Sequence, residues 1–343
     1  GPGEYIAIKR GDILTTDELG MATRQTLRAI GLDEDACATT PSTGCMRAVA
    51  AVPGIAEERR LAALAELWTQ QAMALTPRDA EPASDDEQID AWLEAARHAY
   101  AYLFFSGRAP GERAFEDRQT QVRDYYNYAV QRAAGGMFLR WQQARGLPGP
   151  DGALAADSAP PGGPAADGTE GPGTSIAPPP PSTVRIAGWT VRTDMSGIRM
   201  PDDVELPREL VPASSLSFAG LRSIYRRDGF GAEVVAVMGD DPVTRARAPD
   251  AGAADAGDDP SRRTGPRPRA FSEMPSPALT LLIRFPGDDL DAVLSTRELV
   301  ISAHDPYRED AIDLHGLRVP LAANYTAGYG LSPDEAFPAV LQR

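Results

Sequence analysis

The chain has 343 residues, of which 42% are hydrophobic, enough for two domains or one large one with a buried core. Its formal net charge of −15 at pH 7 argues against nucleic acid and anionic membrane surfaces as partners, because both would repel it. No apolar run reaches the ~18 residues of a membrane-spanning helix, so the sequence predicts no transmembrane segment.

The first part of the chain has the periodicity of helices. Asp17 or Thr16 can cap a helix that continues to about Ile30, where Gly31 supplies the stop. From 55 to 76 apolar residues recur at steps of three and four, which predicts a second helix with one apolar face.

Two cysteines, Cys37 and Cys45, lie between these helices and are separated by seven residues that include Pro and Gly. Such a segment can fold back until the two Cα atoms come within about 6 Å, the distance that a disulfide requires. The alternative is a pair of reduced thiols, and a zinc site is disfavoured because no histidine is near. We favour the disulfide, and with it an exported protein in an oxidising compartment.

Two further helices complete the predicted bundle. Ser84 and Glu87 form a capping-box pattern at the start of a helix whose apolar residues run from Ile89 to Leu103. The last helix, from about 112 to 145, places large and small apolar side chains along one face. These residues are Phe115, Val122, Tyr126, Ala129, Ala133, Met137 and Trp141. Four helices with short connections indicate a helical domain over residues 4–146.

Residues 147–183 are rich in Pro and Gly and contain no aromatic residue, so they cannot bury enough apolar surface to offset the entropy of ordering. We expect a disordered linker there. A second stretch of this kind, 239–270, predicts a long disordered loop.

Beyond the linker the periodicity changes to that of strands. The segments 184–193, 232–238, 278–285 and 298–305 are short and rich in Val, Ile, Leu and Thr. The second and third should pair as neighbours, and a helix is expected at 214–229 between the first and second. The prediction is therefore an α+β chain: a helical bundle, then a small, mostly antiparallel sheet unit over 184–331, and a tail at 332–343.

The sequence lacks the Gly-x-Ser-x-Gly pentapeptide that carries the nucleophile of α/β hydrolases. In many acyl hydrolases a strand that runs into His-Gly helps to build the oxyanion hole, which draws attention to His315-Gly316. The following residues, "LRVPLAANYTAGYG", contain no strand-ending glycine cluster, so we expect a structural role for His315.

The other two histidines are His98 and His304. His98 lies in mid-helix, where a surface or interface imidazole is the usual interpretation. His304 ends a predicted strand and is followed by Asp305, which could orient an imidazole for general base catalysis. The alternative, which we favour, is a turn residue in front of an Asp-Pro turn. His304 and Asp305 are thus the candidate catalytic pair if the chain is an enzyme.

Acidic residues gather at Asp288, Asp289 and Asp291 after a Pro-Gly pair. They have neither the spacing of an EF-hand nor a histidine partner, so we interpret them as acids that open a helix and complement its dipole. No glycine-rich phosphate loop is present either. The sequence predicts no metal and no cofactor.

Four segments resemble the region upstream of the catalytic domain in a family of exported bacterial α/β-hydrolase-like lipoproteins of the lipase or esterase type. They are "GERAFEDRQTQVRDYYNYAVQR", "YRRDGFGAEVVAV", "ALTLLIRFPG" and "IDLHGLRVPLAANYTAGYGL". The resemblance covers residues 4–331 apart from the two low-complexity stretches. In that family the nucleophile follows the segment that matches "NYTAGYGL", so none of its catalytic residues can be assigned here.

The resemblance implies an accessory, non-catalytic region of an exported, lipid-anchored serine hydrolase that acts on an ester or lipid. Its partner would be its own downstream hydrolase domain or another envelope protein, in the periplasm or at the outer membrane of a Gram-negative bacterium. The alternatives are a stand-alone envelope binding or scaffolding module, and a complete enzyme of another kind that uses His304 with Asp305 or the Asp288 cluster.

Overall fold

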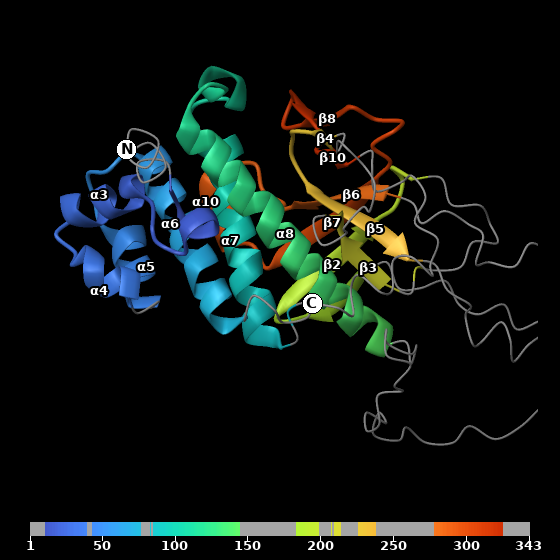
Figure 1. The fold of residues 1–343 in the computed structure, drawn as a ribbon, viewed down its shortest axis with the longest axis horizontal. Helices are drawn as coiled ribbons and strands as arrows, with labels where there is room; N and C mark the ends of the chain where they lie inside the picture. Colours follow the sequence, from blue (N-terminus) through green and yellow to red (C-terminus); the bar gives the residue numbers. More distant parts are fainter. Residues whose placement is uncertain are drawn as a thin grey trace, which may run out of the picture. The chain divides into compact units, whose positions relative to one another are not determined.

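The computed structural model describes residues 11–39, 43–76, 83, 85–144, 183–198, 207, 209–213, 226–237 and 278–324. It confirms the predicted α+β class, with helices first and a mostly antiparallel set of strands after them (Figure 1). The chain divides into two compact units. The first comprises Gly1–Asp194 and Ile283–Ile301, and the second comprises Met195–Leu282 and Ser302–Arg343.

The first unit contains the helices. They are α2 (Ile13–Thr16), α3 (Met21–Ala29), α4 (Glu34–Thr39), α5 (Thr43–Ala51), α6 (Glu57–Leu75), α7 (Asp86–Phe105), the short 3₁₀ helix η1 (Pro110–Arg113), α8 (Asp117–Ala144) and α10 (Leu290–Ser295). The three long helices α6, α7 and α8 form the body of the bundle, with α7 packed against both of the others (Figure 1). The predicted apolar faces of these helices supply its core, in which Leu61, Trp92 and Tyr126 are completely buried.

The helix predicted from residue 16 or 17 to 30 begins later, as α3 at Met21, and the separate short helix α2 precedes it. Asp12 caps α2 by accepting from the backbone N–H groups of Leu14 and Thr15, each at 3.1 Å. Asp17 then ends that helix in the left-handed region, with φ of 66°. Gly31, at φ of 80°, follows the end of α3 as predicted. The capping signal at Asp17 therefore marks a helix end, because a short aspartate side chain tolerates positive φ.

The start of α7 also differs from the prediction by one residue. Asp85 is the N-cap, and its carboxylate accepts from the backbone N–H of Gln88 at 2.9 Å. Ser84, the predicted cap, lies outside the described residues. An aspartate next to a serine offers the stronger acceptor and also complements the helix dipole.

Phe115 does not lie on the buried face of the last helix. Pro110 and Gly111 form a 3₁₀ turn after α7, and α8 begins only at Asp117, so Phe115 falls in the connection between them. Its exposure is 103% of the reference value. The buried face of α8 therefore begins at Val122, about two turns after Phe115.

The strand predicted at 184–193 is a hairpin within the first unit. Strands β1 (Thr183–Ile186) and β2 (Trp189–Asp194) pair antiparallel, with Ile186 opposite Trp189. The two residues between them, Ala187 and Gly188, have φ of 51° and 79°, as in a type I′ turn.

The remaining strands are β3 (Glu209–Pro212), β4 (Arg226–Arg227), β5 (Ala232–Val237), β6 (Ala278–Arg284), β7 (Glu298–His304), β8 (Ala311–Leu314), β9 (Leu317–Pro320) and β10 (Ala323–Asn324). In the second unit β5 pairs antiparallel with β6, as predicted, and with β3 on its other side. The division between the two units falls inside β6 and β7.

A buried indole fastens the β1–β2 hairpin to the helices of the first unit. The Nε1 of Trp189 donates to the carboxylate of Asp90 on α7 at 2.8 Å. The guanidinium groups of Arg97 and Arg297 lie 4.6 Å and 5.0 Å from the centre of the indole ring. Residues 184–194 and 283–301, which the sequence places in the sheet unit, therefore belong to the helical unit.

Four predicted segments fall on residues outside the description: the linker apart from Thr183, the loop at 239–270, most of the helix at 214–229 and the tail at 332–343. In the part of the chain that is described, no helix has the length and apolar character needed to cross a membrane.

Candidate functional site around His304

The C-terminal end of β7 brings a serine and a histidine onto one face of the strand. Side chains alternate along a strand, so Ser302 and His304 point the same way. Asp305 then opens a tight turn: its carboxylate accepts from the backbone N–H of Tyr307 at 2.9 Å, and its carbonyl accepts from that of Glu309 at 3.0 Å. The turn returns the Glu309 side chain to the imidazole.

The three side chains form a hydrogen-bonded series. The Oγ of Ser302 lies 2.9 Å from the Nε2 of His304, and the Nδ1 of His304 lies 2.9 Å from the Oε2 of Glu309. This is the order of contacts in a serine–histidine–acid triad, in which the imidazole takes the serine proton and the carboxylate holds its tautomer. The distances alone would suit general base catalysis.

The exposure of the three groups is the reverse of what acyl transfer needs. Ser302 is 3% exposed, whereas the side chains of His304 and Glu309 are 14% and 41% exposed. A nucleophilic serine has to meet its substrate while the acid is buried behind the imidazole. Here the acid faces solvent and the hydroxyl is enclosed.

Neighbouring backbone covers the hydrogen-bonded array of Ser302, His304 and Glu309. A Cβ added at Gly197 would lie 2.6 Å from the carbonyl oxygen of Ala303 and 2.8 Å from the Nδ1 of His304, so only glycine fits at this contact. On the Glu309 side, Arg227 donates to the Glu309 carbonyl at 3.2 Å and to that of Leu321 at 2.8 Å. The array joins β7, the following turn and Arg227 of β4 within the second unit.

The predicted partner of His304 and its actual partner differ. Asp305 directs its carboxylate to the backbone of its own turn, and the imidazole contacts Glu309 instead. Neither Ser302 nor Glu309 was singled out from the sequence. Two features of the sequence could have indicated them. Ser302 and His304 are two residues apart on a predicted strand, and Glu309 lies four residues after Asp305, where an Asp-Pro turn begins.

His315 and Gly316 form the turn of the β8–β9 hairpin. Their φ angles are 51° and 75°, and Leu314 and Leu317 on either side are paired. The pair thus has the same conformation as Ala187-Gly188 in the first hairpin. The segment that resembled an oxyanion strand is a type I′ turn.

His98 is enclosed in the helical unit. Its Nδ1 lies 2.7 Å from the carbonyl oxygen of Glu94 one turn earlier on α7, and its ring stacks with that of Trp68 on α6 at 6.3 Å between centres. Burial lowers the pKa of His98 below its usual value, although the Glu94 carboxylate acts in the opposite direction.

The acidic group at 288–291 behaves as a helix start. Asp289 caps α10, and its carboxylate accepts from the backbone N–H of Ala292 at 2.8 Å. Within the described ranges, no group of three or more His, Cys, Asp or Glu side chains could hold a metal ion.

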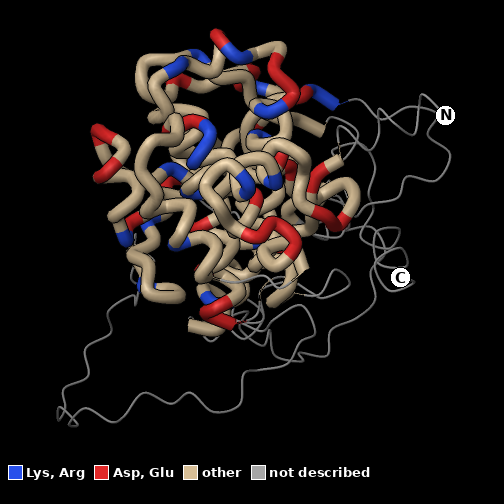
Figure 2. The backbone as a smooth tube through the Cα atoms, turned by 90° about the vertical axis from the view of Figure 1, so that its left-hand side faces the viewer, with Lys and Arg blue, Asp and Glu red and all other residues tan. Residues whose placement is uncertain are grey.

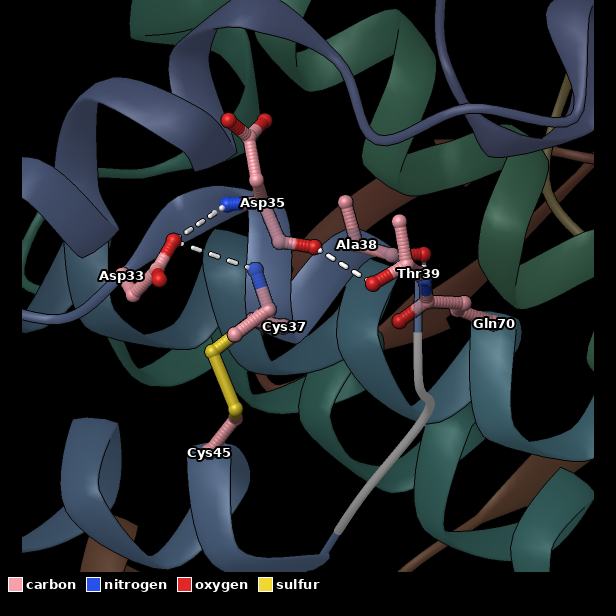
Figure 3. The surroundings of a disulfide bond; sticks show 8 residues. Asp33, Asp35, Cys37, Ala38, Thr39, Cys45 and Gln70 are labelled. Atoms are coloured by element: carbon pink, nitrogen blue, oxygen red, sulfur yellow. Dashed lines mark hydrogen bonds between the residues drawn. A yellow bond between two sulfur atoms is a disulfide. The ribbon is translucent and has the colours of Figure 1, made fainter.

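The predicted disulfide between Cys37 and Cys45 is present (Figure 3). It joins α4 to α5 with the two Cα atoms 6.0 Å apart. Asp33 caps α4 by accepting from the backbone N–H groups of Asp35 and Ala36, at 3.0 and 3.1 Å. Cys37 is buried in an apolar cluster with residues of α3, α5 and α6, so the bond lies next to the core that these short helices form with α6.

Comparisons with protein-family models, with curated proteins and with solved structures each find no match.

Proposed function

We propose that this chain is a non-catalytic accessory region of an exported serine hydrolase that acts on esters or lipids. The observation that carries the non-catalytic part is the reversed exposure of Ser302 and Glu309. With the hydroxyl enclosed and the carboxylate partly exposed, the three side chains serve to link β7 to the turn that follows it. The chemistry then belongs to a separate domain.

The disulfide supports the exported location. A bond between Cys37 and Cys45 persists in an oxidising compartment such as the periplasm, and it is rare in the bacterial cytosol. The proposal places the protein in the periplasm or at the outer membrane, where a lipid anchor would hold the parent hydrolase.

The link to a hydrolase comes from the four segments that resemble the region upstream of a lipase-like catalytic domain. The charge of the chain supports a protein partner over a nucleic acid. Its net charge is −15, and acidic and basic positions are interspersed along the described backbone (Figure 2).

The proposal is tested on the purified chain with a short-chain p-nitrophenyl ester and with a fluorophosphonate probe for nucleophilic serines. We expect ester hydrolysis at the buffer rate and no covalent labelling, with Ser302→Ala indistinguishable from the parent. Labelling that disappears in Ser302→Ala and His304→Ala, but persists in a Ser295→Ala control on α10, would instead establish an active serine.

The second half of the proposal is tested on the natural polypeptide. If its reading frame contains a Gly-x-Ser-x-Gly domain after residue 343, the two parts should form a complex when they are expressed as separate chains. A stop codon at that point, with no hydrolase bound by the purified chain, would favour a stand-alone envelope module. The observation in favour of that second candidate is the division of the chain into two compact units, each with its own buried residues.

A further inference from the structure

The position of the short helix α4 depends on its contacts with neighbouring helices. Of its six residues, only Cys37 is buried. Ala38 is partly buried against the same apolar cluster, and the other four residues face solvent in part or completely. So short a helix is not stable by itself, because it forms few backbone hydrogen bonds for the residues that it orders.

The polar contacts between α4 and its neighbours are weak. Two arginines of α3 form ion pairs with Glu34 and Asp35, at 2.8 Å and 3.1 Å, but one partner in each pair is more than half exposed to solvent. One hydrogen bond reaches α6, from the side-chain amide of Gln70 to the carbonyl oxygen of Ala38, at 2.8 Å. Among the described residues, the disulfide is therefore the strongest constraint on α4 (Figure 3).

The apolar cluster that Cys37 enters is built by other parts of the helical unit. Its remaining buried members are Leu19, Leu27, Met46, Val49, Ala63, Leu64 and Leu67. They belong to α3, α5, α6 and the residues just before α3. Since α6 also packs against α7 and α8, this framework does not need α4. Departure of α4 would uncover part of the cluster and leave the bundle folded.

The two cysteines differ in their access to solvent. Cys37 is 3% exposed, whereas Cys45 is partly exposed and follows the exposed residues Thr43 and Gly44. Reduction of a disulfide by a thiol begins when a thiolate reaches one of the two sulfur atoms. In the folded protein, the reagent can therefore approach Cys45 and not Cys37.

We propose that the bond between Cys37 and Cys45 is a redox-sensitive switch: a dithiol oxidoreductase reduces it, and α4 then leaves the apolar cluster. A thiolate of the dithiol attacks the Sγ of Cys45, the S–S bond breaks, and Cys37 leaves with the electron pair. The second thiol of the dithiol then displaces Cys45. The dithiol becomes a disulfide, and its two electrons and two protons end on Cys37 and Cys45.

The switch does not rest on the proposed function. It requires only a dithiol that reaches Cys45, in whatever compartment the chain occupies. In an oxidising compartment the bond forms again and α4 returns to the cluster, so the docked position is the resting state there.

The test follows backbone amide exchange by mass spectrometry in the purified full chain, without denaturant, before and after addition of dithiothreitol. Exchange in peptides that cover α4 should become faster by roughly tenfold or more, because the helix loses protection when it leaves the cluster. Peptides of α7 should exchange as slowly as in the oxidised protein. Removal of the reductant and reoxidation should restore the slow exchange of α4.

Two variants separate the bond from the other contacts of α4. In Cys37→Ala/Cys45→Ala, α4 should exchange as fast as in the reduced parent and should not respond to dithiothreitol. Gln70→Ala is the matched control, because it removes the hydrogen bond to Ala38 and keeps the disulfide. In that variant α4 should stay protected until the reductant is added.

The point of attack is tested with a thioredoxin-type dithiol protein whose second cysteine is replaced by alanine, so that the mixed disulfide cannot resolve. Peptide mapping should find this protein attached to Cys45. A mixed disulfide on Cys37 would overturn the assignment of Cys45 as the reacting residue.

Three other results would overturn the switch itself. If neither dithiothreitol nor the trapping protein reacts until urea unfolds the chain, the bond is a permanent structural link. If reduction proceeds and α4 exchanges as slowly as before, other contacts hold the helix. If α7 loses protection together with α4, reduction unfolds the whole helical unit and releases no single element.

Discussion

At the scale of single residues, His98 couples stability to pH. It is enclosed between α6 and α7, and the charged and aromatic groups that face it are Glu94 and Arg97 on its own helix and Trp68 on α6. Burial lowers its pKa in the folded state, so the unfolded state binds a proton more readily. Neutral His98 therefore adds to the stability of the folded state. This stabilisation is complete above the ordinary histidine pKa of 6.5 and is lost as the pH falls below that value.

We therefore expect the free energy of unfolding to decrease between pH 7.5 and pH 5.5, in a urea titration followed by circular dichroism, and this slope to be smaller in His98→Gln. His315→Asn is the control, because His315 lies exposed in a hairpin turn where asparagine accepts the positive φ. If the unfolding free energy of His98→Gln changes with pH as steeply as that of the parent, His98 is not the source of the pH dependence.

Glu66 is a second residue whose environment predicts a large effect of substitution on stability. Its carboxylate is completely buried and accepts from the backbone N–H groups of Ile13 at 3.2 Å and Gly20 at 2.7 Å, and from the hydroxyl of Thr23. Arg118 on α8 lies 3.4 Å away. The side chain thus joins the first two short helices to α6 and α8.

Glu66→Ala should lower the free energy of unfolding by about 3 kcal/mol or more, since it leaves buried donors without an acceptor and removes the carboxylate that pairs with the partly buried guanidinium of Arg118. Chemical denaturation measures this directly. Glu66→Gln keeps one acceptor oxygen and should cost less. Glu57→Ala, at the exposed start of the same helix, should change stability by less than about 1 kcal/mol; an equally small effect at Glu66 would count against its role.

At the scale of elements, the disulfide fixes the position of α4 against α5. The two cysteines are eight positions apart, so the bond closes a short loop and limits the unfolded chain. The chain-entropy relation for a loop of this length corresponds to roughly 2–3 kcal/mol. The double variant Cys37→Ala/Cys45→Ala should lose about that much stability in urea.

The effect of the bond is isolated by measuring the unfolding midpoint of the parent protein with and without reductant. The double variant is measured under the same two conditions. Reductant should lower the unfolding midpoint of the parent and leave that of the double variant unchanged. If reductant shifts the unfolding midpoint of both proteins equally, the bond adds nothing to the stability of the protein.

At the scale of the whole molecule, the first unit is discontinuous in sequence. Residues 283–301 contribute contacts that the helices need: the backbone N–H and carbonyl of Ile283 both bond to the buried hydroxyl of Tyr126, and Arg97 donates to the carbonyl of Thr296 at 2.5 Å. Phe285 packs edge-on against Tyr100 and Trp189. The helical unit is therefore incomplete without a segment that lies far beyond Asp194 in the sequence.

A fragment that ends at residue 194 should accordingly unfold at lower temperature and with less cooperativity than the full chain, as measured by near-ultraviolet circular dichroism and scanning calorimetry. Addition of a peptide of residues 278–301 should restore part of the lost signal. A fragment that melts like the full chain would show that the helices are self-sufficient.

Much of the fold follows from the order of the residues alone. Apolar periodicity determined α6, α7 and α8 to within a few positions, because each helix buries one continuous face. Val- and Ile-rich segments determined β5, β6 and β7, and the spacing of Cys37 and Cys45 determined their bond. All of these follow from chemistry that neighbouring residues carry with them.

Tertiary structure alone decided the remainder. Whether Asp17 starts a helix or ends one, whether Ala187-Gly188 lies in a strand or a turn, and whether Phe115 is buried or exposed depend on how distant segments pack. The candidate site depends on the fold in the same way: the distances among Ser302, His304 and Glu309 would suit catalysis, and only their burial reverses that interpretation. Exposure is set by what folds over a residue, which its neighbours in sequence do not specify.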